Sequence, residues 1–156
     1  MRKVIVYRTV LWVFTLGLAG AIFWLSHQTA EQSGALSEEV TQGFLGTLFS
    51  FLKLTEGQQA VVHALVRSAA HVVLFALLGT SVALLFRSYA VRRWQGITVL
   101  VCGAYALVDE CHQQWFSAGR AFELADLVKD IVGVLLGIGA VLLVCFWRAK
   151  LRKKGT

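Results

Sequence analysis

The chain between residues 109 and 130 reads DECHQQWFSAGRAFELADLVKD, and this stretch places five carboxylates, His112, Arg120 and Lys129 between two long apolar runs. The charges extend into the ends of both runs instead of staying in the connection between them. A charged side chain at the edge of a bilayer-spanning segment costs free energy unless it finds a partner or water, so such residues are candidates for a functional site. The stretch therefore predicts where the protein acts, although it specifies no reaction.

The composition is that of a membrane protein. The 156-residue chain is 57% hydrophobic and 15% charged, with a mean hydropathy of +0.67, whereas a soluble domain is about half apolar and about a quarter charged. A helix crosses a bilayer with roughly 17–25 mostly apolar residues. The sequence predicts an all-α integral membrane bundle that forms a single domain over residues 1–156. Its four predicted transmembrane helices cover residues 4–25, 68–86, 94–116 and 127–147.

The distribution of charge predicts the orientation of these spans. With four crossings, 11 of the 15 Lys and Arg residues fall on the side that holds both termini, and all nine Asp and Glu residues fall on the other side. Because Lys and Arg are retained on the cytoplasmic side, we expect a multi-pass cell-membrane protein with both termini in the cytoplasm. The net charge of +6 is then a topology signal, so the basic segment 148–154 is expected to meet anionic lipid and no nucleic acid.

The first apolar run could instead be a signal peptide, since Ala19-Gly20-Ala21 resembles a cleavage site. The run over residues 4–25 is longer than a typical signal core, which favours a retained helix. In the first loop, Leu36, Val40, Phe44, Leu48 and Leu52 recur every four residues. This spacing predicts an amphipathic helix on the outer membrane surface, after an irregular polar segment at 26–34.

Two local patterns predict how the later helices begin and pack. Thr55 and Gln58 form a capping box that starts the second span, so that Arg67 and His71 share one stripe of it. Gly133 and Gly137 have the GxxxG spacing, which lets a neighbouring helix backbone approach closely, and Gly139 is expected to extend this smooth side.

The outer ends of three spans bring polar side chains to one level of the membrane. We expect them to form a polar pocket at the outer leaflet, because pairs four residues apart share a helix face. The candidates are Arg67 and His71 in the second span, Asp109, Glu110 and Gln113 in the third, Arg120 in the next loop, and Asp126 and Asp130 in the fourth.

Three interpretations of this pocket remain open. In a purely structural network, ion pairs orient the helices, with Arg120 on Asp126 and His71 on Asp109 or Glu110, since unpaired charges at this depth are costly. In a recognition site, two arginines hold the phosphate or carboxylate of a membrane lipid, a lipid-linked envelope precursor or a glycopeptide. The expected ligand-binding residues are Arg67, Gln113, Arg120, Asp126 and Asp130.

In an enzyme, His71 serves as general base, Glu110 or Asp109 orients it or acts as the acid, and Arg120 stabilises negative charge. Such a site would act on a lipid-linked phosphate or ester, although no serine elbow or phosphate loop is present. A divalent cation, transport or a proton pathway is a further possibility. No cofactor and no metal are expected, because His112 lacks the ligand spacing of a zinc site and is expected to be a wet surface residue.

The polar residues also carry a resemblance. The chain resembles the VanZ-like family of membrane proteins over most of its length, with three departures: Ala118 where the family usually has Pro, Asp130 where it usually has Asn, and Phe75 where it often has Tyr. The resemblance implies a four-helix envelope protein linked to resistance to the glycopeptide teicoplanin, without implying a reaction. The matching residues are the segment 26–33 and Ser37, Arg67 and His71 with Gly79, Asp109, Glu110 and Gln113, Gly119 and Arg120, Asp126, and Gly133.

Overall fold

The computed structural model describes residues 1–52, 55–116 and 122–154, and every regular element in these ranges is an α-helix. The predicted all-α class and the additional helix in the first loop are therefore confirmed. The helices are α1 (Arg2–Ser26), α2 (Ala30–Leu52), α3 (Glu56–Ser88), α4 (Trp94–Phe116) and α5 (Leu124–Lys154).

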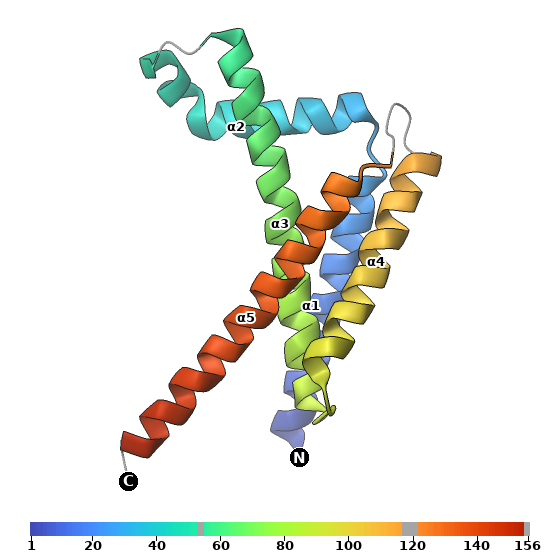
Figure 1. Ribbon diagram of the computed structural model, residues 1–156, viewed down its shortest axis with the longest axis vertical. Coiled ribbons are helices and arrows are strands. Elements are labelled where there is room, and N and C mark those ends of the chain that lie inside the picture. The colour runs from blue at the N-terminus through green and yellow to red at the C-terminus, as the bar shows by residue number, and fades with distance from the viewer. Residues whose placement is uncertain (53–54, 117–121, 155–156) are drawn as a thin grey trace.

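Helices α1, α3, α4 and α5 form a bundle in which both chain ends lie at the same end (Figure 1). Helix α2 lies across the opposite end (Figure 1). Among the described helices, α1, α3 and α5 are long and apolar enough to cross a membrane. Helix α4, with 23 residues, is long enough but not apolar enough, because its apolar stretch 96–108 is bounded by Gln95 and by the adjacent acids Asp109 and Glu110.

Capping boxes fix the starts of α2, the helix within the first loop, and of α3, the helix that follows it. The predicted box at α3 is confirmed, since the Gln58 amide donates to Thr55 Oγ1 at 3.4 Å and the Thr55 amide donates to Gln58 Oε1 at 2.9 Å. Thr29 and Gln32 form the same arrangement at α2, with distances of 3.2 and 3.1 Å. The predicted irregular segment 26–34 is therefore wrong beyond Thr29, because this cap starts α2 before its apolar pattern begins.

The closest packing in the bundle is the crossing of α3 and α5. A Cβ added at Gly133 would lie 2.5 Å from the Val72 carbonyl oxygen, and one at Gly137 would lie 2.3 Å from that of Ala76. The predicted close approach is thus confirmed at both glycines. The prediction that Gly139 extends it is wrong, since nothing lies within 4 Å of its added Cβ. Two residues turn an α-helix by about 200°, so Gly139 faces away from α3.

The bundle buries polar groups and exposes aliphatic ones. Asp109, Glu110 and Asp130 are only 1–3% exposed, whereas Val13 and Leu100 are 67% and 71% exposed. A soluble protein has the reverse arrangement, because charged side chains are rarely buried and large apolar patches are rarely exposed. This polarity is typical of helices surrounded by lipid, where ionisable residues face the interior of the bundle.

Replacing Gly137 with alanine is expected to destabilise the protein by about 1–3 kcal/mol, because the new methyl group would overlap backbone atoms of α3 that cannot move aside easily. Gly139→Ala, on the free side of the same helix, is the matched control. The measurement is the midpoint of thermal unfolding in one detergent. Equal midpoints for the two variants would contradict the crossing described above.

Candidate functional site

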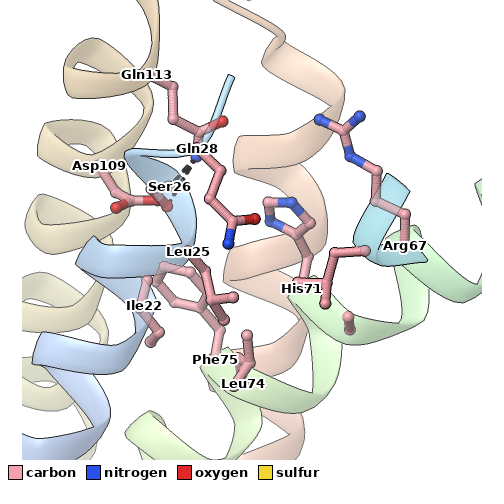
Figure 2. Close-up of a pocket in the computed structure, with 12 residues that line it drawn as sticks. Ile22, Leu25, Ser26, Gln28, Arg67, His71, Leu74, Phe75, Asp109 and Gln113 are labelled. Carbon is pink, nitrogen blue, oxygen red and sulfur yellow. Dashed lines mark hydrogen bonds between the residues drawn. The ribbon is translucent and has the colours of Figure 1, made fainter. Parts of the chain in front are cut away.

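A pocket of about 110 Å³ opens between α1, α3 and α4, at the end of the bundle that α2 covers (Figure 2). Its floor is apolar and its upper wall is polar, so it is suited to an amphiphilic molecule. The apolar lining comes from Ile22, Leu25, Leu36, Ala70, Leu74 and Phe75, and the polar lining comes from Ser26, Gln28, Arg67, His71, Asp109 and Gln113.

One wall of the pocket is a hydrogen-bonded cluster that joins α1 to α4. Ser26 Oγ donates to Asp109 Oδ2 at 2.7 Å, and Gln113 Nε2 donates to the same oxygen at 2.9 Å. Gln113 Nε2 also lies 3.2 Å from Ser26 Oγ. The predicted shared face of Asp109 and Gln113 is confirmed, and all three side chains are at most 5% exposed. Asp109 Oδ1 is buried without a hydrogen-bond partner among the described residues, and it has almost no surface exposed to the pocket.

The sequence assigned no role to Ser26, although it lies within the segment that carries the family resemblance. A serine at the end of an apolar helix could equally be a cap or a solvated residue, so its spacing gave no signal of a long-range contact. Gln28 was missed for the same reason. Its side chain reaches from the turn after α1 into the space beside His71 (Figure 2).

His71 ties α3 to α5. Its Nδ1 lies 3.1 Å from Asp130 Oδ1, and its Nε2 lies 4.0 Å from Asp126 Oδ2. The expected pairing of His71 with Asp109 or Glu110 is replaced by a pairing with the two acids of α5. The glycine crossing explains the difference, because Asp130 lies one turn before Gly133 and is carried against α3 by the same close approach.

Asp126 and Asp130 therefore lie behind His71, and neither lines the pocket. Asp126 accepts a hydrogen bond from Lys129, one turn along the same helix. Its expected partner Arg120 lies outside the described residues, as does the rest of the segment 117–121.

Glu110 faces away from the pocket and toward the start of α5. Its Oε1 accepts a hydrogen bond from the Glu123 backbone amide at 2.6 Å, while the Glu123 carbonyl accepts from the Asp126 amide at 2.9 Å. The side chain is 1% exposed, so this contact fixes the end of α4 to the first turn of α5. Glu110 thus stabilises the junction between α4 and α5, and unlike Asp109 it does not line the pocket.

Arg67 is half-buried and lies at the mouth of the pocket. Its guanidinium group lies beyond His71, toward the end of the bundle that α2 covers (Figure 2). Its position one turn from His71 is as the sequence predicts. Among the described residues, no carboxylate lies within 4.0 Å of it to form an ion pair. The guanidinium is therefore the positive group of this pocket that is available to an anion.

The sequence predicts a water-exposed surface position for His112, but the structure places its ring against other rings. Its ring lies 4.4 Å from that of Phe23, 5.4 Å from that of His27 and 5.1 Å from that of Phe116, so it packs in an aromatic cluster between α1 and α4. Within the described ranges, no group of three or more His, Cys, Asp or Glu side chains is arranged to hold a metal ion.

Replacing Ser26 with alanine is expected to cost about 1–3 kcal/mol of stability, because the buried Asp109 carboxylate loses a donor that no water replaces easily. Ser81→Ala is the matched control. Ser81 is also buried, but its hydroxyl donates to Leu78 within its own helix, at 2.9 Å. The measurement is the midpoint of thermal unfolding of the two variants. If Ser81→Ala lowered stability as much as Ser26→Ala, the result would contradict a stabilising role for the α1–α4 cluster.

The comparisons with known proteins place this architecture in a sequence family. The sequence model of the family described as VanZ/LLP1 matches residues 11–147, which include α2, α3 and α4 and every described residue of the pocket. No curated protein and no solved structure matches the chain.

Proposed function

The chain belongs to the VanZ/LLP1 family of membrane proteins, and from this membership we propose a topology for the bundle and a ligand for its pocket. The protein is a multi-pass membrane protein with three long apolar helices that can cross the bilayer. We propose that α4 is the fourth crossing and that both termini are cytoplasmic.

Two observations support a fourth crossing. Helix α4 packs against both α3 and α5 along the bundle, so it occupies the same layer as helices that can span. Its polar residues Asp109, Glu110 and Gln113 face the protein interior and are at most 3% exposed. Polar residues in a spanning helix are tolerated when they face the bundle, so a low average hydropathy is compatible with a span. The cytoplasmic side follows from the basic residues near both termini.

The topology predicts opposite labelling of two exposed positions. In a background where the native cysteines are replaced by serine, Glu31→Cys should react with a membrane-impermeant maleimide in intact cells. Lys150→Cys, at the other end of the bundle, should react only after the membrane is opened. Reaction of both positions from one side, or the reverse pattern, would refute the proposed orientation.

We propose that the pocket binds the phosphate-bearing headgroup of a membrane lipid or of a lipid-linked envelope precursor in the outer leaflet. The observation that carries this proposal is the Arg67 guanidinium at the mouth of an amphiphilic pocket, with no ion pair among the described residues. Arginine binds phosphate through two parallel hydrogen bonds. The amide of Gln28 suits a hydroxyl or amine of the same headgroup.

The size of the pocket limits the ligand. Sites that enclose a drug-sized molecule have volumes of about 300–1,000 Å³, whereas this pocket measures about 110 Å³. It can take a headgroup fragment, while an apolar tail remains in the bilayer beside Leu25, Leu36 and Leu74. A whole glycopeptide does not fit inside. On this proposal, the link of the family to glycopeptide resistance runs through an envelope precursor and not through enclosure of the antibiotic.

Arg67→Gln is expected to weaken binding of undecaprenyl phosphate by about tenfold or more, since it removes a charge-assisted hydrogen bond. The matched control is Arg92→Gln, an exposed arginine at the other end of the bundle. Binding is measured by native mass spectrometry of purified protein, with uncharged undecaprenol as the ligand control. Equal binding of the phosphate and the alcohol, or equal loss in both variants, would defeat the proposal.

An enzymatic role for the same pocket is the second candidate, because Asp130 holds the His71 ring at 3.1 Å in the manner of a group that orients a general base. The two candidates differ in turnover. If the protein is incubated with undecaprenyl pyrophosphate, release of phosphate that His71→Gln abolishes would establish an enzyme. Binding without release would leave the recognition role in place.

A further inference from the structure

A second cavity, of about 470 Å³, lies between α1, α3 and α5 at the end of the bundle that holds both termini. Helix α5 diverges from α3 toward this end (Figure 1), which leaves a wedge between them, and residues of both helices line the cavity. The glycine crossing produces this wedge, because two straight helices that touch at Gly133 and Gly137 must separate on either side of that contact. The cavity is distinct from the outer pocket and shares no lining residue with it.

The lining of this cavity changes from apolar to basic along both long helices. On α3 it runs from Leu84 to Arg87, and on α5 it runs from Val141 to Arg148. Both helices run toward the terminal end of the bundle (Figure 1), so in each helix the arginine comes after the apolar residues and lies nearer that end. A phospholipid in the leaflet at that end has the same polarity, with its phosphate at the surface and its acyl chains below.

The chain supplies no side-chain carboxylate to neutralise these arginines, since Asp and Glu are absent from residues 1–30, 57–108 and 131–156. Arg8, also at this end, is already engaged by the Ser88 carbonyl and by the Tyr89 ring, 4.1 Å from its guanidinium carbon. Arg87 lies over the Trp94 ring at 5.3 Å, a stacking arrangement that still lets a guanidinium donate hydrogen bonds in its own plane.

We infer that this cavity binds an anionic phospholipid of the leaflet at the terminal end, with its phosphate on Arg87 and Arg148 and its acyl chains along Leu84, Val141 and Val144. Basic pockets between transmembrane helices on the cytoplasmic side are suited to such headgroups. The volume lies within the range of about 300–1,000 Å³ that holds a small-molecule ligand. The inference does not depend on the ligand of the outer pocket, although the name of the leaflet depends on the proposed orientation.

The first test is native mass spectrometry of purified protein with phosphatidylglycerol or with phosphatidylcholine of the same chain length. The wild type is expected to retain one phosphatidylglycerol in preference to phosphatidylcholine. Arg148→Gln should weaken this binding by about fivefold, the effect of roughly one surface charge. Arg152→Gln, one turn further along α5 and outside the lining, should retain it. Equal retention of the two lipids, or equal losses in the two variants, would overturn the inference.

The second test keeps both arginines and uses Cys145, a half-buried cysteine that lines the cavity. In the Cys111→Ser variant the other remaining thiol, Cys102, is 1% exposed, so maleimide reports on Cys145. Phosphatidylglycerol should slow labelling, and phosphatidylcholine should not. Equal labelling rates with the two lipids would refute the site. A dimer in which Cys145 is protected without lipid would assign the cavity to a second copy of the chain, which also refutes it.

Discussion

Carboxylates buried at the ends of apolar helices are the constraint on which this structure depends. Four acids, Asp109, Glu110, Asp126 and Asp130, are at most 6% exposed. A buried charge without a partner is too costly to keep, so each acid requires a contact that joins it to another group. Asp109 accepts from Ser26 and Gln113, and Glu110 accepts from the start of α5. Asp126 accepts from Lys129, and Asp130 contacts His71. These contacts set which helix ends meet, and so they create the pocket.

The two ends of the bundle follow from one crossing. Gly133 and Gly137 let α5 touch the backbone of α3, which brings Asp130 onto His71 above the contact and opens a wedge below it. The pocket at the end that α2 covers combines the Arg67 guanidinium with buried acceptors in a small space. The cavity at the end that holds both termini is larger, and it combines two arginines with an apolar lining. We propose a phosphate ligand for both sites, but the size of the molecule that can enter with the phosphate differs, because the cavity volumes are about 110 and about 470 Å³.

Several features that depend on local spacing could be predicted from the sequence, although the cap at Thr29 and the direction of Gly139 were not. The Thr55 cap, the shared face of Asp109 and Gln113, and the glycine approach each depend on residues within four positions of one another, where helix geometry is fixed. The partners of His71 and Glu110 could not be predicted, since they depend on the crossing of helices far apart in sequence. His112 shows the same limit, because its polarity indicated water while the fold placed it among aromatic rings.

The central claim is that buried polar contacts between helices shape the pocket, and the contact of His71 with Asp130 is its most direct test. A double-mutant cycle with His71→Ala, Asp130→Ala and the double variant measures their coupling in thermal unfolding. The account predicts a coupling free energy of about 1–3 kcal/mol, since contacting polar residues are not additive. Losses that add to within about 0.5 kcal/mol would show that the two side chains do not meet, and would contradict the account.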